Sequence, residues 1–521
     1  MRWIALSFLL FATAVEAAPP VGFDARVEAL RERFGVPGAA VTIVEGGETT
    51  LARGYGVRQL GAPERVDAAT IFQTGSTGKA FTSAAIALLV DQGRLKWDDR
   101  VIDHMPWFRM YDPYVTREIT VRDLLTHRSG LGLGAGDLLF VPRGKLSRRE
   151  SVERLAHIKP ATSFRDRYAY DNILYMVAGQ LIEEVTGQTW EAFVGQHLLK
   201  AAGMNVSTTD PDSRRANPNR AFPHARISGP LRGVGELSRL DEREDLGHAA
   251  NPAGALAISA EDMARWLKIQ LARGALPEGG RLFSEAVANE MWTPVVPMSI
   301  APLPDVVKAA QPNFDNYALG WDVRDYRGAK IVWHAGGVFG AIAIVALIPE
   351  KNVGFAIMAN AEEGQLLRGL MFELMDHYLG APSTDWPDRW AEVYRARIAG
   401  GLEALKVAQA KPAKVGPSLP LDRYAGDYVD PWYGKLAIRP KGKGLTVDFT
   451  TTPRMAGRLE HWQYDTFVTR FDDKAIEPAY LTFGLDADGK VERITLKPVS
   501  PLADFSYDYR DLLFTPAEAS R

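Results

Sequence analysis

The chain has 521 residues, a formal net charge of −3 and no cysteine. Hydrophobic residues make up 46 % and charged residues 24 % of it, which is typical of a soluble globular protein. This length is more than one ordinary hydrophobic core holds, so we expect two domains. The absence of a basic stripe argues against a nucleic-acid partner, and the absence of cysteine excludes disulfides.

The first twenty residues, MRWIALSFLLFATAVEAAPP, follow the pattern of a secretory signal peptide. Arg2 gives a positive start, residues 4–15 form an apolar run, and small residues precede a cleavage position after Ala17. The apolar run is too short to span a bilayer comfortably. We therefore predict a signal peptide over 1–17 and a secreted or periplasmic protein without a stable membrane anchor once the signal is removed.

The next part of the chain alternates strand and helix patterns. Apolar positions at helical spacing predict a helix over 23–34, and two apolar runs around Gly46-Gly47 predict a β-hairpin. Helical periodicity also marks 119–131 and 170–199. The stretches 208–250 and 294–316 are polar or irregular, so we expect loops that rim a site.

The periodicity changes near residue 330. Short apolar runs over 330–360 predict antiparallel strands with a tight turn at Pro349–Asn352, and a helix is expected over about 362–380. We expect residues 22–380 to form one mixed α/β unit, followed by a helix and linker over 381–420. Beyond the linker the pattern is all strand, which predicts a small β domain over 421–521.

Ser76 and Lys79 lie three positions apart at the start of an apolar run, QTGSTGKAFTSAAIALLV. A serine hydroxyl is a weak nucleophile until a neighbouring base takes its proton. On a helix, a lysine three residues on lies on the same face, and it can act as that base if burial or a nearby cation keeps part of it neutral. The alternative is an N-cap serine with a solvated lysine. No other serine in the chain has a lysine at this spacing.

Two further stretches strengthen the catalytic interpretation. Tyr170-Asp171-Asn172 is the only Y-x-N in the chain, and His334-Ala335-Gly336-Gly337 opens a predicted strand whose edge could hold a substrate backbone. Each residue taken alone has a purely structural interpretation. Tyr170 would be a packed aromatic side chain and Asn172 a helix cap or turn residue. His334 would be a hydrogen-bonded histidine at a strand start, and Gly336-Gly337 a β-bulge. Their combination with Ser76 and Lys79 favours catalysis.

In order and rough spacing, these motifs resemble those of the serine β-lactamase and penicillin-binding-protein family. The resemblance is closest to the class C β-lactamase-related branch, which includes D-Ala-D-Ala carboxypeptidases, D-aminopeptidases and esterases. It is supported by four further stretches: 124–131, 170–187, 254–267 and 317–321. It implies an α/β (α+β) transpeptidase-like domain with an antiparallel sheet and a helical subdomain. Residues 421–521 resemble the lipocalin-like β-barrel that some members carry.

The resemblance also implies roles for the motif residues. Ser76 would be the acylated nucleophile, Lys79 its base or proton relay, and Tyr170 the group that passes a proton to the leaving group. Asn172 would bind a substrate amide and help to fix Lys79. The N–H groups of Ser76 and Gly337 would form the oxyanion hole, with Gly336 beside them at the strand edge.

One motif departs from the family pattern. Penicillin-specific members have K-T-G where this chain has His334-Ala335-Gly336. Histidine is mostly neutral at pH 7 and alanine supplies no donor, so the sequence favours esters, amides or D-amino-acid peptides over efficient β-lactam hydrolysis. We expect His334 to gain charge as pH falls toward 6 and then to recognise a carboxylate. His127, in LLTHRSGL, is interpreted as structural, closing a helix end.

The leading hypothesis is a serine hydrolase that forms an acyl-enzyme with a small-molecule or peptide substrate. A catalytically silent ligand- or peptidoglycan-binding protein and an acyltransferase remain as alternatives. No metal or cofactor is expected, and no zinc motif of the H-E-x-x-H kind is present. We expect the C-terminal β domain to fold separately and to act on substrate choice rather than on the chemistry.

Overall fold

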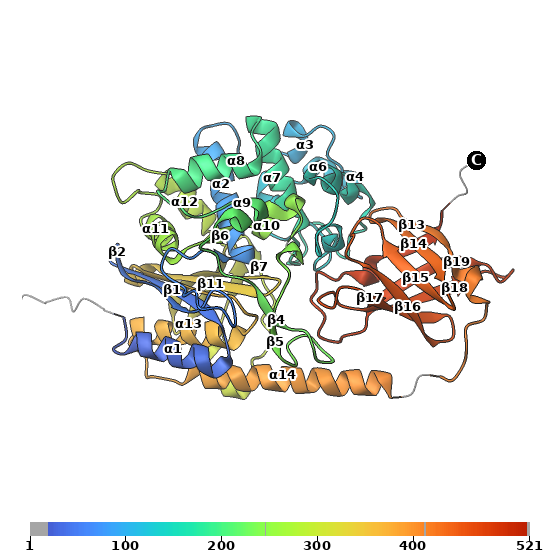
Figure 1. Ribbon diagram of the computed structural model, residues 1–521. Coiled ribbons are helices and arrows are strands. Elements are labelled where there is room, and N and C mark those ends of the chain that lie inside the picture. Colours follow the sequence, from blue (N-terminus) through green and yellow to red (C-terminus); the bar gives the residue numbers. More distant parts are fainter. Residues whose placement is uncertain (1–18, 245, 411–412, 518–521) are drawn as a thin grey trace, which may run out of the picture.

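A computed structural model describes residues 19–244, 246–410 and 413–517. The predicted signal peptide, 1–17, lies outside these ranges. Figure 1 shows a mixed unit of sheet and helices at the left, a barrel at the right, and the long helix α14 (Trp386–Gln409) running below them. Within the described ranges, no helix has the length and apolar character needed to cross a membrane.

The sheet of the mixed unit has eight strands in the order β2-β1-β12-β11-β10-β9-β8-β7, and every neighbouring pair is antiparallel. Its central strands are apolar and buried on both faces. The strands are β1 (Gly38–Glu45), β2 (Glu48–Gly56), β7 (Val296–Pro297), β8 (Asp315–Tyr317), β9 (Asp322–Tyr326), β10 (Ala329–Val338), β11 (Ala341–Ile348) and β12 (Val353–Ala359).

Two predicted turns of this sheet are confirmed. The β1–β2 hairpin turns at Gly46 and Gly47, whose φ values of 58° and 90° suit glycine and the twist of a two-residue hairpin loop. Between β11 and β12 the chain turns at Pro349–Lys351 and leaves through Asn352 at φ 50°, a conformation that asparagine tolerates. Local sequence is sufficient for both turns because each depends on the backbone preferences of one or two residues.

Helices cover both faces of the sheet (Figure 1). On one face, α13 (Gly364–Tyr378) contacts β11 and β12, and α1 (Phe23–Phe34) packs beside it. The sequence predicts both helices, but not where they pack. On the other face, α11 (Ala260–Leu271) contacts β1 and β12. Two large groups of buried apolar side chains therefore sandwich the sheet.

The helical subdomain is built around α2 (Lys79–Asp91), which is buried over most of its length and contacts α7 (Ile173–Thr186). A helix that is apolar on all sides must be enclosed by others, and α2 is. Shorter helices complete this subdomain and its surroundings: α3 (Val101–His104), α4 (Pro113–Glu118), α5 (Val121–Leu124), α6 (Arg148–Glu153), α8 (Trp190–Val194), α9 (Pro211–Ala216), α10 (Asn251–Gly254) and α12 (Glu285–Met291).

The two predicted loop regions carry only short elements. The first contains the hairpin of β4 (His224–Arg226) and β5 (Leu237–Arg239), and a two-stranded pair of β3 (Phe72–Gln73) with β6 (Ala257–Ile258) lies nearby. The second contains β7, a 3₁₀ segment and the start of β8.

The C-terminal domain is a closed barrel of eight antiparallel strands. Alternating apolar residues predict strands over 433–440, 445–451, 464–471 and 479–499, the last stretch with a hairpin turn at 486–490. These stretches cover five of the strands and miss β13, β16 and β20. The strands are β13 (Gly426–Asp430), β14 (Gly434–Lys441), β15 (Gly444–Phe449), β16 (Ala456–Gln463), β17 (Thr466–Phe471), β18 (Ala479–Leu485), β19 (Val491–Pro498) and β20 (Leu513–Pro516). The fold class expected from the sequence, a β-lactamase/transpeptidase-like domain with a barrel, is thus confirmed.

The barrel packs directly against the mixed unit. Buried apolar side chains of both domains form one continuous core cluster. Thr452 Oγ1 donates to the Leu138 carbonyl at 3.1 Å, and the backbone N–H of Lys145 donates to the Thr451 carbonyl at 2.9 Å. The prediction that the β domain folds separately stays a prediction, because a contact in the folded chain does not test it.

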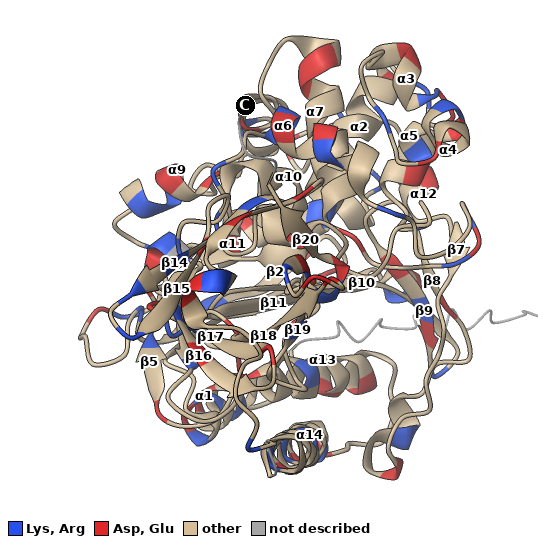
Figure 2. Ribbon diagram, turned by 90° about the vertical axis from the view of Figure 1, so that its right-hand side faces the viewer, with Lys and Arg blue, Asp and Glu red and all other residues tan. Residues whose placement is uncertain are grey.

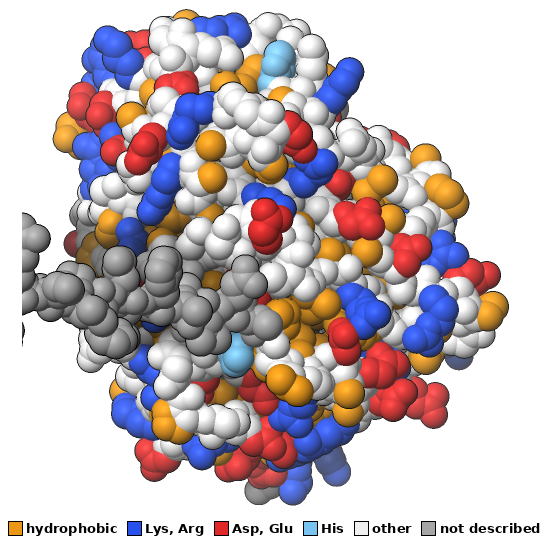
Figure 3. Space-filling view, turned by 90° about the vertical axis from the view of Figure 1, so that its left-hand side faces the viewer, with side chains coloured by type: hydrophobic (Ala, Val, Ile, Leu, Met, Phe, Trp, Pro, Cys, Tyr) orange, Lys and Arg blue, Asp and Glu red, His pale blue; other side chains and the backbone are white. Residues whose placement is uncertain are grey.

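Charged side chains of both signs are distributed over the molecule rather than collected in one stripe. Figure 2 looks onto the barrel side and Figure 3 onto the opposite side, and in both views Lys and Arg lie interspersed with Asp and Glu. This distribution matches the net charge of −3.

Candidate active site

Ser76 lies in a 3₁₀ turn, η1 (Gly75–Gly78), and Lys79 is the first residue of α2. In a 3₁₀ turn, side chains three residues apart eclipse one another. Lys79 Nζ accordingly lies 3.1 Å from Ser76 Oγ. The structure brings the two residues together through this turn rather than through a continuous α-helix, and the N-cap alternative with a solvated lysine does not describe it.

The Lys79 side chain is fully buried, and that burial lowers the pKa of its amine to about 7. Nζ lies 2.6 Å from Asn172 Oδ1 and 3.0 Å from the Ala253 carbonyl oxygen, both of which can only accept hydrogen bonds. A neutral amine has two hydrogens and one lone pair. Donation to these two oxygens therefore leaves the lone pair facing Ser76 Oγ, as a general base requires.

Tyr170 approaches the nucleophile from the other side. Its hydroxyl donates to Ser76 Oγ at 2.5 Å. Burial raises the pKa of Tyr170 well above its ordinary value, so the phenol stays protonated at any pH of interest. Of the two groups, Lys79 is therefore the one that can accept a proton from Ser76, and Tyr170 is the one that can donate a proton.

His127 packs against the ring of Tyr170. Its buried ring lies 4.4 Å from the Tyr170 ring, centroid to centroid, and its Nδ1 accepts from the backbone N–H of Asp171. The residue has φ 56° and lies three residues beyond the end of α5, so it follows that helix without capping it. The structural interpretation fits this geometry, but the contact with Tyr170 has no signal in the local sequence.

Asn172 connects the lysine to a carboxyl group that the sequence analysis missed. While Oδ1 accepts from Lys79, Nδ2 donates to Asp137 Oδ2 at 2.8 Å. Asp137 is fully buried in the short turn η2 (Asp137–Leu139), and burial raises the pKa of its carboxyl to about 7. Its sequence context, GAGDLL, matches no catalytic motif, so only the fold could reveal this residue.

The strand β10 carries His334-Ala335-Gly336-Gly337 past Ser76. A Cβ on Gly336 would lie 2.0 Å from the Thr74 carbonyl oxygen and 2.8 Å from Ser76 N, so only glycine fits there. A Cβ on Gly337 would meet Ile342 at 3.8 Å, an ordinary contact. Gly336 is therefore what lets the strand edge lie against the nucleophile turn.

His334 does not behave as the sequence analysis expects. Only 3 % of the residue is exposed, and burial, together with the positive charge of Lys79, lowers the pKa of its imidazole to about 3. Its Nδ1 lies 2.6 Å from the Ala335 carbonyl and its Nε2 2.9 Å from the Tyr317 hydroxyl. A carbonyl only accepts, so Nδ1 carries the proton and Nε2 accepts from Tyr317. The expected charge switch near pH 6 is wrong, because the ring is packed and neutral.

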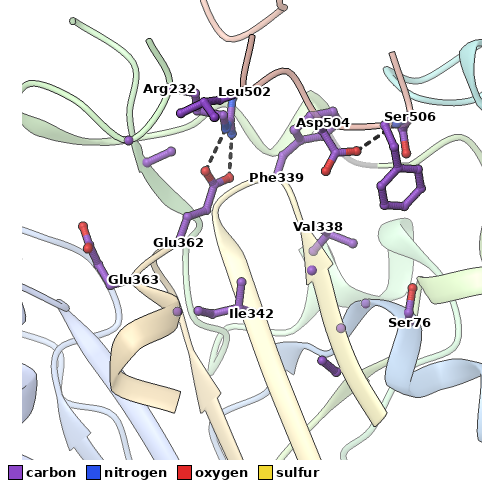
Figure 4. Close-up of a pocket in the computed structure, with 18 of the residues that line it drawn as sticks. Ser76, Arg232, Val338, Phe339, Ile342, Glu362, Glu363, Leu502, Asp504 and Ser506 are labelled. Atoms are coloured by element: carbon purple, nitrogen blue, oxygen red, sulfur yellow. Dashed lines mark hydrogen bonds and ion pairs between the residues drawn. The ribbon is translucent and has the colours of Figure 1, made fainter. Parts of the chain in front are cut away.

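A cavity of about 1050 Å³ opens at Ser76. Figure 4 shows Ser76 on one wall, with the ion pair of Arg232 and Glu362 on the opposite side and Asp504 and Ser506 of the barrel above. Most of the lining that the cavity offers a ligand is apolar. The apolar side chains include Phe140, Leu246, Trp333, Val338, Phe339, Ile342, Ile398 and Leu502.

A loop of the barrel contacts two side chains of the candidate site. Ser506 Oγ donates to Asp137 Oδ2 at 2.7 Å, and the Phe505 ring stands edge-on to the Tyr170 ring at 5.6 Å. No motif in the sequence predicts a role for these residues. Nothing in a stretch such as PLADFSYDYR predicts which distant side chains it contacts.

Comparison with known proteins agrees with this geometry. Residues 23–378 match the beta-lactamase family, and residues 410–516 match a domain of unknown function, DUF3471. The chain is 30 % identical over 440 residues to "Unguisins hydrolase ungD'" of Aspergillus campestris, which covers 78 % of this chain and 75 % of that protein. It is 29 % identical over 341 residues to "Penicillin-binding protein 4" of Amycolatopsis lactamdurans, covering 64 % and 84 %.

Solved structures share the fold. The octameric penicillin-binding protein homologue from Pyrococcus abyssi aligns over 95 % of this chain and 100 % of its own, with a TM-score of 0.57 and 21 % identity. A class C beta-lactamase mutant with a tyrosine-to-phenylalanine substitution aligns over 65 % and 91 %, with a TM-score of 0.51 and 18 % identity. With its serine, lysine and tyrosine assembled at one cavity and a family match over residues 23–378, the chain belongs to the beta-lactamase family.

Proposed function

We propose that the protein is an exported serine hydrolase that acts through a Ser76 acyl-enzyme on an ester, amide or D-amino-acid peptide. One observation carries this proposal. Ser76 Oγ lies within hydrogen-bond distance of both a buried lysine amine and a protonated tyrosine, at the wall of a large cavity. A serine so placed has a base to take its proton and a donor to protonate a leaving group.

The proposed reaction consists of an acylation of Ser76 followed by a deacylation. Ser76 Oγ attacks the substrate carbonyl carbon while its proton moves to Lys79 Nζ. The carbonyl oxygen becomes an oxyanion, which the N–H groups of Ser76 and Gly337 stabilise. When the intermediate collapses, the bond to the leaving group breaks. Tyr170 gives that group a proton and recovers one from the Lys79 ammonium. Water then hydrolyses the ester bond to Ser76 by the same route in reverse.

The electrostatics of the strand edge narrow the substrate class. The buried, neutral His334 and the alanine beside it offer neither the permanent cation nor the hydroxyl of a K-T-G motif. The cavity lining is mostly apolar, and Arg232 is paired with Glu362. Together these features favour an apolar acyl group and predict weak or no β-lactamase activity. The name of the fungal relative, unguisins hydrolase, supports a hydrolytic reaction.

Export is part of the proposal and rests on the sequence of residues 1–17, with its positive start, apolar run and small residues before Ala18. When the full chain is expressed, we expect the secreted protein to lack the first seventeen residues. Mass spectrometry of the mature N-terminus measures this. Retention of those residues would contradict it.

Two alternatives make different predictions. A catalytically silent binding protein would take up no fluorophosphonate at Ser76, whereas the hydrolase is labelled there. An acyltransferase would form the same acyl-enzyme but release the acyl group faster when an added amine or alcohol accepts it. Intact-protein mass spectrometry after incubation with esters, D-peptides and penicillins reports which acyl group remains on Ser76. Absence of both labelling and acylation would overturn the proposed function.

A further inference from the structure

We propose that the barrel loop 502–508 is part of the catalytic centre, with Ser506 as a positioning residue that holds Lys79 through Asp137 and Asn172. This inference rests on the proposed function, because it concerns the base of the same serine. It replaces the expectation that the barrel acts on substrate choice alone.

A continuous series of hydrogen bonds joins the barrel to the nucleophile. Ser506 Oγ donates to Asp137 Oδ2 at 2.7 Å, and Asn172 Nδ2 donates to the same oxygen at 2.8 Å. Asn172 Oδ1 then accepts from Lys79 Nζ at 2.6 Å, and Nζ lies 3.1 Å from Ser76 Oγ. Since Oδ2 receives both donors, the hydroxyl of Ser506 fixes the carboxyl plane that in turn orients the Asn172 amide.

The turn that carries Asp137 is also held by the barrel. The buried carboxyl of Asp508 accepts from the backbone N–H of Gly136 at 2.7 Å and from that of Leu138 at 3.3 Å, one residue to either side of Asp137. Buried N–H groups need such partners, and here the partner comes from 370 residues further along the chain. The mixed unit alone therefore leaves this turn without the acceptor that shapes it.

The same loop touches the third catalytic side chain. The Phe505 ring packs edge-on against the Tyr170 ring, at 5.6 Å and 79°. The Phe505 backbone also lies close to Gly134 of the mixed unit. A Cβ on Gly134 would lie 2.7 Å from the Phe505 carbonyl oxygen, and Gly134 has a φ of +71°, which favours glycine. Two separate contacts thus connect the loop to the catalytic groups, one through Asp137 and one through Tyr170.

The charge of Asp137 gives this arrangement an electrostatic signature. A negative Asp137 raises the pKa of Lys79, whereas the hydroxyl of Ser506 lowers the pKa of Asp137 by stabilising its carboxylate. The titratable groups that face Lys79 are Asp137, Asp171, His127, His334, Tyr170 and Tyr175. Those that face Asp137 are Lys79, Tyr170, Asp504 and Asp508.

The experiment is a double-mutant cycle in the full chain, read as the acylation rate with a small activated ester. We expect Ser506→Ala to lower kcat about tenfold, equal to about 1.4 kcal/mol, with KM unchanged. Ser506→Thr, which keeps a hydroxyl, should recover most of the rate. Combining Ser506→Ala with Asp137→Asn should give a rate within about twofold of Asp137→Asn alone, because both changes break the same chain.

A matched control is Thr469→Val, which removes another buried barrel hydroxyl, one whose hydrogen bond to the backbone N–H of Ala479 lies within the barrel. It should change kcat less than about twofold and should combine additively with Asp137→Asn. Rates are normalised to the fraction of protein that takes up fluorophosphonate, so loss of folded protein does not count as loss of rate.

The pH profile provides a second readout. Loss of the Ser506 hydroxyl raises the pKa of Asp137, so the carboxyl is neutral over a wider range and the pKa of Lys79 falls. The acid limb of the acylation rate should therefore move to lower pH in Ser506→Ala. A wild-type rate and an unmoved limb in Ser506→Ala, or additive effects with Asp137→Asn, would overturn the inference while leaving Ser76 labelling intact. Absence of labelling in the wild type would instead remove the proposed function.

Discussion

Lys79 and Asn172, 93 positions apart in the chain, are joined by a hydrogen bond of 2.6 Å between Nζ and Oδ1. This contact uses one hydrogen of the amine, and the Ala253 carbonyl uses another. The orientation of the lysine lone pair toward Ser76 therefore depends on the residue that precedes α7 and on α10, as well as on the motif spacing.

Replacing the nucleophile tests the central assignment. Ser76→Ala should abolish fluorophosphonate labelling and lower hydrolysis to background, because no other serine has a lysine at hydrogen-bond distance in the described ranges. The melting temperature should stay close to that of the wild type. The control is Ser299→Ala, an exposed serine next to the cavity residue Met298, which should keep full labelling. Persistent hydrolysis by folded Ser76→Ala would refute the assignment.

Lys79→Arg separates a base from a fixed charge. A guanidinium stays protonated and cannot accept the serine proton, so we expect the acylation rate to fall by roughly 10²- to 10⁴-fold. Stopped-flow measurement of the acylation burst gives this rate directly. If Lys79→Arg kept a large share of the wild-type rate, the lysine would act only through its positive charge.

The pH dependence of acylation follows from the site. The Lys79 amine is the active form when it has lost its proton, and its pKa is lowered to about 7, so kcat/KM should rise through pH 7 and level off above pH 8. Because the pKa of Asp137 is also about 7, the acid limb of the pH–rate profile reports the joint titration of Lys79 and Asp137 rather than that of Lys79 alone. Asp137→Asn removes a negative charge that raises the pKa of Lys79, so the limb should move to lower pH. A limb that moves to higher pH would contradict this sign.

His334 should give a flat specificity profile. Since its pKa is lowered to about 3, the ratio of kcat/KM for a carboxylate substrate to that for its neutral amide should not change between pH 8 and 5.5. A ratio that rises as pH falls through 6.5 would show that His334 becomes protonated and binds the substrate carboxylate.

His334 should also contribute to the pH dependence of the free energy of unfolding. Its folded-state pKa lies below the unfolded value of about 6.5, so its contribution to stability is full above pH 6.5 and is lost as pH falls toward 3. The loss amounts to at most about 1.4 kcal/mol for each pH unit in that window. Urea unfolding of wild type and His334→Gln at pH 7 and pH 5 measures it, and the variant should show the smaller decrease.

The strand edge is tested by two adjacent glycines. Gly336→Ala places a Cβ 2.0 Å from the Thr74 carbonyl oxygen, so β10 must move away from the nucleophile turn and we expect most acylation to be lost. Gly337→Ala keeps its N–H and meets only Ile342 at 3.8 Å, so it should lose far less. Equal losses in the two variants would show that closeness to Ser76 is not what the first glycine provides.

The sequence by itself predicted much of this protein. Helix α1, the hairpin at Gly46-Gly47, the turn at Pro349–Asn352 and most barrel strands depend on local periodicity and on turn residues, which can be read from short windows. The family resemblance on Ser76, Lys79 and Tyr170 is likewise carried by short motifs, and residues 23–378 do match the family.

Only the tertiary structure decided the electrostatics of the site and its contact with the barrel. Whether Lys79 is neutral, whether His334 can be charged and whether Asp137 belongs to the site all depend on burial, which side chains distant in the chain create together. Ser506 reaches Asp137 across 369 positions, and no periodicity or spacing encodes such a contact. A pKa is set by the solvent and charges around a group, and these exist only once the chain has folded.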